Sequence, residues 1–516
     1  MEESDDDEEE WAHLRRRRKP DRPKLFSRLR VLVAAAVLLI MLSWRRSSAV
    51  PHERARRSSC PALRATTKAD SSLVRTLGSL WPDRRPELDA HPAVYAARAD
   101  ARQQLGPLFW ADVHDGIDSC VLVIMDGTLA ERLFADDGVA LHRHFDMQTS
   151  KGLKFAVGAD WKRQRSILTK HVLTDAGKMA RADAAVPEAA ACLVSKLRAN
   201  TTTSIVDLMP PLRECLAVFF VTAVMGSRGW PKEDRSHMAR RMVECEGTGC
   251  NGREGGPRES TFECLRRPME REVDRRIGAY GAGSAAAADP DADSLLGRML
   301  QRVDGGGGLL REEVVTNAIS FLSAGWETST LTMVNTLWLL LQKEYHHAVH
   351  SDSQLAARAL DETLRWRPPI PWHGGTTVKP IVADAKVGSN GSSSSTYEIP
   401  KGTRMIVDII GTHELPREGL LGPRGGVSRW DPRRNGNAPP LHAGGVGARH
   451  CPGGAMAKRG MAALLGELMR AFPKLALAAS ATEVHRWLQG YRAEVGSDIC
   501  ELLYRQSLPV RREGLV

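Results

Sequence analysis

The most informative stretch of the sequence is GGVGARHCPGGAMAKRGMAALLGELMRAF, which runs from Gly444 to Phe472. A glycine-rich loop leads directly into Cys451, and apolar side chains follow at helical spacing. A thiol at the start of a helix lies near unpaired backbone N–H groups and the positive end of the helix dipole, and both favour the thiolate. Glycines such as Gly445, Gly447 and Gly453 let the backbone approach a large flat ligand closely.

Arg449 stands two residues before this thiol, where it can pair with an anionic group on such a ligand. Taken alone, the segment allows two interpretations. In the first, the loop presents Cys451 as a thiolate ligand to a soft metal centre. In the second, Cys451 is a buried structural cysteine among turn glycines. Other segments are needed to decide between them.

One such segment is DETLRWRPPIP, from Asp361 to Pro371. Glu362 and Arg365 stand three residues apart on one helix face, where they can form an ion pair. The two prolines that follow Arg367 stop the helix. An isolated pair of this kind is usually a solvated salt bridge, so it acquires meaning only beside other motifs.

A second segment is NAISFLSAGWETSTLTMVNTLWLLL, from Asn317 to Leu341, which is predicted to be a long apolar helix. Glu327 and Thr328 interrupt it beside the small pair Ala324 and Gly325, which leaves space next to the backbone. An acid and a hydroxyl in an apolar helix are costly unless they have a task or partners. The alternative is a bent helix whose threonine hydroxyl bonds back to a carbonyl.

Together, these segments resemble the cytochrome P450 family of heme-thiolate monooxygenases in residue type, order and spacing, over about residues 81–505. AGWETS resembles the oxygen-activating helix of the family, with Glu327 and Thr328 as its acid–alcohol pair. GADWKRQRSILTKH, from Gly158 to His171, resembles the helix that contacts the heme propionates. The series Gly445-x-Gly447-x-Arg449-x-Cys451-x-Gly453 resembles the heme-binding loop of the family.

The ion pair has a family counterpart as well. Glu362-x-x-Arg365 resembles the pair found in the family, and RWDPRR resembles the segment whose arginine joins it, which makes Arg434 the third member. The resemblance implies that these three residues are structural and fix the loop that carries Cys451.

The resemblance implies a mainly α fold of the cytochrome P450 type, a large helical domain with a small β-rich part, preceded by an N-terminal apolar segment. Residues 159–346 show mostly helical patterns. Strands are expected at about 107–126 and 376–410, and a helix at 91–106.

The implied cofactor is heme b, iron protoporphyrin IX. Cys451 would be the axial iron ligand, whose electron donation favours cleavage of the O–O bond. Thr328 would hold a water or the iron-bound peroxide, and Glu327 would help relay protons. Arg449, Trp161 and Arg165 would compensate the buried propionates, because an uncompensated buried carboxylate is expensive.

Three features depart from the family pattern. Gly444 stands where the family usually has an aromatic residue, so the thiolate should be more exposed and its redox tuning altered. The family often has an arginine shortly after the two prolines, whereas WHGGTT follows here, so that propionate contact is missing or passes to His373. Glu362 stands only 34 positions after Thr328, an interval more like that of bacterial members than that of typical microsomal ones.

An apolar small-molecule substrate is expected, because the distal pocket would be lined largely by apolar side chains. Each of them is more simply explained as ordinary core. Electrons should come from a separate reductase of the flavoprotein or ferredoxin type, because no flavin or dinucleotide fingerprint occurs. Lys458 and Arg459 could contribute to a basic docking face for it, or could be solvated helix charges. The expected lining comprises Phe145, Leu153, Phe155, Ser320, Phe321, Ala324 and residues after Pro371.

The N-terminus carries opposing charge blocks, so residues 1–30 are expected to be a disordered tail. The apolar run 31–44 would form roughly 21 Å of helix, short against roughly 30 Å of hydrocarbon. Arginines on both sides favour a single-pass membrane anchor, with the endoplasmic reticulum the main candidate and an organelle or plastid an alternative. A cleaved signal or transit segment and a core helix are the other interpretations. Residues 45–80 would be a linker and 81–516 the heme domain.

The 516-residue composition is ordinary for a globular protein, and its net charge of +10 is spread along the chain. Nucleic acid is therefore not expected as a partner.

Nine scattered cysteines argue against a disulfide framework. Cys245, Cys250 and Cys264 lack zinc-site spacing. The neighbours His346, His347 and His350 are better explained as a helix surface than as a metal site.

Three other functions stay open at this point. A peroxide-dependent or isomerising heme-thiolate enzyme would keep the cofactor but not the monooxygenase chemistry, and the intact pair Glu327–Thr328 argues against it. A membrane-tethered heme or gas-binding protein would bind heme without catalysis. A membrane protein without heme would have no porphyrin absorption.

Overall fold

A computed structural model gives the arrangement of the chain, and all the residues it describes belong to one compact unit, Cys60–Val516. The expected charged tail, the apolar segment 31–44 and the expected helix 91–106 lie outside the described residues. No helix of the described part is both long and apolar enough to cross a membrane. The described residues are 64–65, 76–77, 108–112, 120–135, 139–141, 151–154, 156–199, 205–230, 232–250, 261–281, 289–303, 307–342, 345–370, 372–387, 393–413, 430–433, 442–478 and 508–512.

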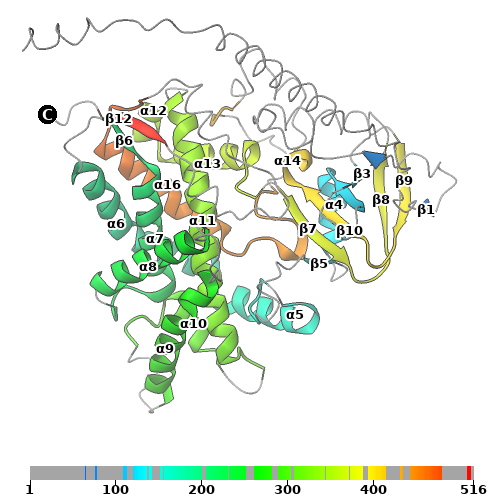
Figure 1. The fold of residues 1–516 in the computed structure, drawn as a ribbon, viewed down its shortest axis with the longest axis horizontal. Coiled ribbons are helices and arrows are strands. Elements are labelled where there is room, and N and C mark those ends of the chain that lie inside the picture. The colour runs from blue at the N-terminus through cyan, green and yellow to red at the C-terminus, as the bar shows by residue number, and fades with distance from the viewer. Residues whose placement is uncertain are drawn as a thin grey trace, which may run out of the picture. The chain divides into compact units, whose positions relative to one another are not determined.

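Helices dominate the structure, as the sequence predicts (Figure 1). Their order along the chain is α4 (Gly127–Ala135), α5 (Gly158–Ile167), the π-helical turn η3 (Leu168–Val172), α6 (Asp175–Ala199), α7 (Met209–Met225), α8 (Lys232–Cys250), α9 (Thr261–Gly281), α10 (Leu295–Leu300), α11 (Arg311–Gln342), α12 (His346–Ser351), α13 (Ser353–Trp366), α14 (Ile409–Thr412), the 3-10 turn η6 (Gly447–Arg449) and α16 (Gly454–Ala471).

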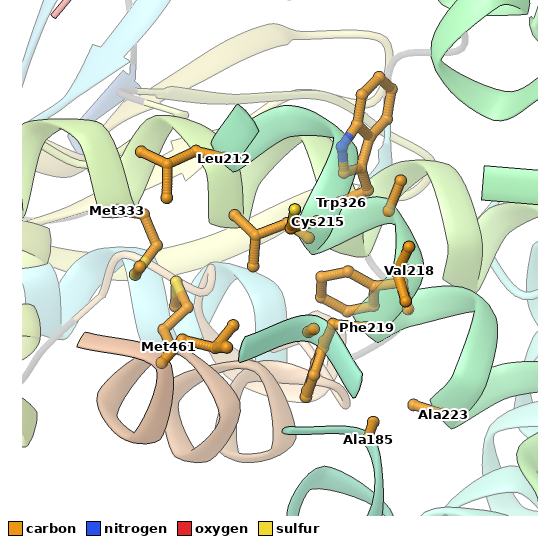
Figure 2. Close-up of a cluster of buried hydrophobic side chains, with 14 of the residues drawn as sticks. Ala185, Leu212, Cys215, Val218, Phe219, Ala223, Trp326, Met333 and Met461 are labelled. Atoms are coloured by element: carbon orange, nitrogen blue, oxygen red, sulfur yellow. The ribbon is translucent and has the colours of Figure 1, made fainter. Parts of the chain in front are cut away.

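Helix α7 lies at the centre of the main core. Its sequence is apolar on nearly every side, which is typical of a helix that is buried all round. It packs against α6, α8 and α11, while α16 packs against α6 and α11. Figure 2 shows Leu212 and Phe219 of α7 in one cluster with Met333 of α11 and Met461 of α16. The core therefore joins the helix that carries Thr328 to the helix that follows Cys451.

The strands of the described residues form three sheets. The largest has the order β2-β3-β4-β10-β7-β5, and it pairs β10 in parallel with β4 and antiparallel with β7. The other two have the orders β1-β9-β8 and β11-β12-β6. The strands are β1 (Arg64–Ala65), β2 (Thr76–Leu77), β3 (Leu108–Asp112), β4 (Cys120–Ile124), β5 (Val139–Leu141), β6 (Ile205–Asp207), β7 (Trp372–Thr377), β8 (Ile381–Val387), β9 (Ser393–Ile399), β10 (Arg404–Asp408), β11 (Leu475–Leu477) and β12 (Pro509–Arg512).

Strands β3, β4, β8, β9 and β10 lie where the sequence predicts them, at about 107–126 and 376–410, whereas β7 begins earlier, at Trp372. The short strands β1, β2, β5, β6, β11 and β12 were not predicted, because two to four residues carry little periodic signal. Two of them, β1 and β2, fall within the expected linker and pair with β9 and β3. Helix α8 continues to Cys250, through Gly247 and Gly249.

The expectation that the cysteines form no disulfide framework was wrong. The structure joins Cys192 to Cys215 and Cys245 to Cys264, with Cα–Cα distances of 5.6 and 5.8 Å. The first bond links α6 to α7, and the second links α8 to α9. Scattered spacing hides these pairs because neighbouring helices bring together residues that lie about twenty positions apart.

Candidate functional site around Cys451

The loop before Cys451 is a tight turn that depends on glycine. Gly445 and Gly447 have φ values of 87° and 61°, a region in which residues with a Cβ are strained. The Cys451 amide donates to the Gly444 carbonyl at 2.7 Å, which closes the turn. The thiol of Cys451 is free and exposed, immediately before helix α16. The structure therefore does not support the alternative of a buried structural cysteine.

The glycines of this loop have different surroundings. A Cβ added at Gly453 would meet nothing within 4 Å, so the loop opens onto free space there. A Cβ at Gly444 would lie 3.1 Å from Nε2 of His450, and one at Gly445 would lie 3.4 Å from Nε2 of His373. Imidazole rings therefore pack against these two glycines.

Helix α5 brings the predicted propionate-contacting residues to this loop. The Arg449 guanidinium lies over the Trp161 ring, 4.2 Å from its centroid, and Nη1 donates to the Ala156 carbonyl at 3.0 Å. Arg165 Nη2 donates to the His450 carbonyl at 2.9 Å. Burial lowers the pKa of Arg165, and the nearby Cys451 charge opposes that shift. The structure thus groups two cations and a buried tryptophan beside the thiol.

Thr328 and Glu327 lie on a different helix, α11. The Thr328 hydroxyl donates to the Ala324 carbonyl at 2.8 Å, which is the back-bonded arrangement weighed from the sequence. Ala324 is exposed, whereas Gly325 faces α7, and a Cβ at Gly325 would collide with the Phe220 ring. The predicted space beside the small pair is therefore filled by Phe220 on the Gly325 side and open on the Ala324 side.

A buried polar network ties the segment before α5 to the start of α11. Arg163 forms an ion pair with Glu313, and Gln164 Nε2 donates to Glu313 at 3.0 Å. Asn317 donates from Nδ2 to Gln164 at 3.0 Å and accepts the Leu153 amide at 2.7 Å. The network fixes the segment whose Ala156 carbonyl binds Arg449. The sequence offered no signal for it, because its members are scattered.

The expected distal lining is described in part. Leu153 is buried, and Phe321 is half-buried on α11. Ser320, Ala324 and Thr328 follow one another at intervals of four and so share a helix face. Phe145 and Phe155 lie outside the described residues.

The predicted ion pair forms, and both of its side chains are buried. Arg365 donates from Nε and Nη2 to the two oxygens of Glu362, each at 2.7 Å. The Asp431 amide donates to Glu362 at 3.3 Å. The RWDPRR segment therefore contacts this ion pair. Arg434 itself lies outside the described residues.

Two histidines that the sequence did not single out connect this pair to the loop. Nδ1 of His413 lies 2.9 Å from the Arg365 carbonyl, and the His442 amide donates to Nε2 of His413 at 3.0 Å. The His442 carbonyl then accepts the Gly445 amide at 2.8 Å. Neither histidine lies in a motif, so no sequence signal marked them.

The other charged candidates have structural partners. Lys458 pairs with Asp361 at 3.0 Å and Arg459 with Asp183 at 2.8 Å, so both charges are partly neutralised. His346 is buried and His347 is exposed on α12. Among the residues that the structure describes, no group of histidines, cysteines and acids is arranged to hold a metal ion.

Comparisons with known proteins agree with the resemblance. A relative of this chain is averantin hydroxylase from Aspergillus parasiticus, 29% identical over 126 residues. That match covers 21% of this chain and 24% of the relative, so the chain matches about a quarter of that protein's length.

Solved structures show the same fold. The cytochrome P450 PksS of Bacillus subtilis 168 has a TM-score of 0.61 at 15% identity, covering 84% of this chain and all of that one. CYP109E1 from Bacillus megaterium in complex with corticosterone has a TM-score of 0.59 at 16% identity, covering 83% of this chain and all of that one. The family model described as Cytochrome P450 matches residues 99–245 and 288–479. The chain belongs to the cytochrome P450 family.

Proposed function

We propose that this protein is a heme-thiolate monooxygenase that inserts one oxygen atom from O2 into an apolar organic substrate. Its cofactor would be heme b, and its electrons would come from a separate reductase. The observation that carries the proposal is the free, exposed thiol of Cys451, presented at the start of α16 by a glycine turn beside Arg449 and Arg165.

The residues around Cys451 fit such a cofactor. A thiolate is a suitable axial ligand for heme iron, and the cations Arg449 and Arg165 suit its anionic propionates. Nε2 of His373 is buried without a hydrogen-bond partner in the described structure. Burial, together with the charge of His450, lowers the pKa of His373 to about 4. A neutral imidazole left without a partner beside the loop is consistent with a propionate contact in place of the family's arginine.

The heme would supply oxygen activation, and the chain's own residues would set its conditions. Cys451 lies just before the N-terminal end of α16, where a thiolate ligand would meet the positive end of the helix dipole. Because burial lowers the pKa of Arg165, an anionic group of the cofactor next to it would offset part of that cost. Arg449, stacked on Trp161, holds a second cation in place.

On the distal side, the Thr328 hydroxyl donates a hydrogen bond to the Ala324 carbonyl, so its oxygen can accept a hydrogen bond from a water molecule. Glu327 is half-buried one residue earlier, where a carboxylate could pass protons inward from solvent. The exposed face of Ala324 lies one turn before Thr328. Thr328 and Glu327 would hold and pass protons on the distal side of the cofactor.

Further observations support the substrate class and the source of electrons. The apolar residues Leu153 and Phe321 favour an apolar substrate, and a hydroxylase among the relatives favours hydroxylation. The electrons would come from a separate reductase, of the flavoprotein or ferredoxin type, because the chain has no flavin or dinucleotide fingerprint. Attachment to a membrane through residues 31–44 stays a prediction.

The test compares sources of oxidising equivalents. Purified protein loaded with heme should show turnover of a spin-shifting substrate with NADPH and a reductase, and little turnover with hydrogen peroxide. Turnover with peroxide alone would support the peroxide-dependent alternative instead. Stoichiometric heme without NADPH consumption, across fatty acids, sterols and terpenoids, would support a non-catalytic heme protein.

A further inference from the structure

His413 lies at a junction between the ion-paired helix α13 and the Cys451 loop. Its side chain is almost fully buried, just after the short helix α14. One ring nitrogen, Nδ1, lies 2.9 Å from the Arg365 carbonyl. The other, Nε2, accepts the backbone N–H of His442 at 3.0 Å. Both nitrogens of this ring are therefore used by backbone groups.

These partners fix the protonation state of the ring. A nitrogen that accepts a backbone N–H cannot carry a proton itself, so Nε2 of His413 is unprotonated. A carbonyl can only accept, so Nδ1 must carry the proton that it donates to Arg365. The neutral Nδ1–H tautomer alone satisfies both contacts.

The backbone of His442 connects His413 to the loop that carries Cys451. Its carbonyl accepts the amide of Gly445, the glycine with a φ of 87° at the start of the cysteine turn. Its ring stacks on that of His413 at 5.9 Å between centroids, and it contacts Thr412 at 3.0 Å and Glu131 at 3.1 Å. The orientation of His442 is thus fixed from three sides.

We infer that His413 is a positioning residue that locks the Cys451 loop to α13, and that a second proton on His413 releases this lock. Protonated Nε2 would present a hydrogen to the His442 N–H, so a hydrogen bond would be replaced by a clash of two donors. The inference rests on the proposed ligation of iron by Cys451, since loss of the lock would loosen that ligand.

The charges around His413 oppose its protonation. Arg365 and His442 are the cationic or titratable groups that contact it, while Glu362 is committed to Arg365 and Glu131 to His442. Burial, mainly, lowers the pKa of His413 to about 4. A histidine in a released loop would have its ordinary pKa of about 6.5. Acidification below about 6.5 therefore favours the released loop increasingly, until the locked form itself protonates near 4.

The experiment compares three variants with the wild type, all loaded with heme. His413→Gln can donate to the Arg365 carbonyl and accept from His442 with one neutral amide, so it keeps the lock but cannot titrate. His413→Leu removes both contacts. His347→Gln changes an exposed histidine of α12 and serves as the control. The absorption of the thiolate-ligated ferrous carbon monoxide complex is recorded from neutral pH down to about pH 4, with circular dichroism to follow folding.

We expect the wild type and His347→Gln to lose thiolate ligation at a higher pH than His413→Gln, before helical structure is lost. At neutral pH, His413→Leu should lose much of the thiolate signal, whereas His413→Gln should retain it. If His413→Leu does not fold, the inference is still tested by comparing the pH at which the wild type and His413→Gln lose thiolate ligation. Coincident pH curves for those two proteins would overturn the inference, as would wild-type thiolate ligation in a folded His413→Leu protein. A wild type without thiolate signal at any pH would instead contradict the proposed function.

Discussion

At the scale of single residues, the stacking of Arg449 on Trp161 has the most direct consequence for cofactor binding. The guanidinium is held by the ring below it and by the Ala156 carbonyl, so it is oriented before any ligand arrives. A planar guanidinium can stack and pair with a carboxylate at the same time, whereas a lysine ammonium does neither as well.

Replacing this arginine should therefore weaken heme retention. Arg449→Lys is expected to lower heme affinity by about 5- to 30-fold, because a partly desolvated cation–π contact is worth about 1–2 kcal/mol. Heme transfer to an acceptor protein measures the affinity. The control is Arg470→Lys, an exposed arginine on α16 paired with Glu467. Equal heme loss from both variants would show that the stacking has no specific role.

Thr328 gives a second prediction at this scale. Thr328→Ala removes the hydroxyl oxygen but should keep the thiolate spectrum, because the residue makes no bond to the Cys451 loop in the proposed mechanism. Electrons from NADPH should then be consumed with several-fold less product. Thr328→Ser restores the hydroxyl and should restore coupling. Unchanged coupling in Thr328→Ala would remove this residue from proton delivery.

At the scale of elements, helix α7 sets the distance between the two helices of the site. Phe219 and Phe220 pack edge to face, 5.0 Å apart. Phe220 fills the space left by Gly325 of α11, and Phe219 fills the space left by Gly460 of α16. Two adjacent rings of α7 therefore pack where a glycine leaves space, one against α11 and the other against α16.

Adding a methyl group at Gly325 should force α11 and α7 apart. Gly325→Ala is expected to lower the free energy of unfolding by about 1–3 kcal/mol, the usual cost of overpacking. Adding Phe220→Leu should recover part of that loss. Gly278→Ala is the matched control, since Gly278 is in α9 with nothing within 4 Å of an added Cβ, and it should be neutral or stabilising. Chemical denaturation measures all of them. Greater stability of Gly325→Ala than of the wild type would contradict the packing described here.

The elements also show what the sequence can and cannot reveal. The helix around Thr328, the ion pair of Glu362 with Arg365 and the cysteine turn follow from local patterns, and the structure places each of them as expected. The contacts of Phe220 with Gly325 and of His413 with His442 join residues about 30 to 100 positions apart. No periodicity or spacing rule reports such pairs, so only the structure reveals them.

At the scale of the whole molecule, two disulfides fasten neighbouring helices of the core. They close segments with sequence separations of 23 and 19 residues. Crosslinks of that span stabilise a fold by about 3 kcal/mol each in the chain-entropy model. They join α6 to α7 and α8 to α9, helices that carry neither Cys451 nor Thr328, so they should affect stability more than chemistry.

Reduction should therefore lower the melting temperature while leaving the heme spectrum at room temperature unchanged. Calorimetry with and without a thiol reductant measures the effect, and Cys192→Ala with Cys215→Ala should reproduce part of it in non-reducing buffer. Alkylation before reduction should leave these four cysteines unmodified. Their ready alkylation in the native, unreduced protein would show that the bonds do not form.

The proposed function depends most on the sulfur of Cys451 being the iron ligand. The direct measurement is the absorption spectrum of the reduced, heme-loaded protein under carbon monoxide, for the wild type and for Cys451→Ala. The wild type should show the red-shifted band of a thiolate-ligated complex, and Cys451→Ala should lack it. A wild-type spectrum typical of histidine ligation, or the same band in Cys451→Ala, would contradict ligation of the iron by Cys451.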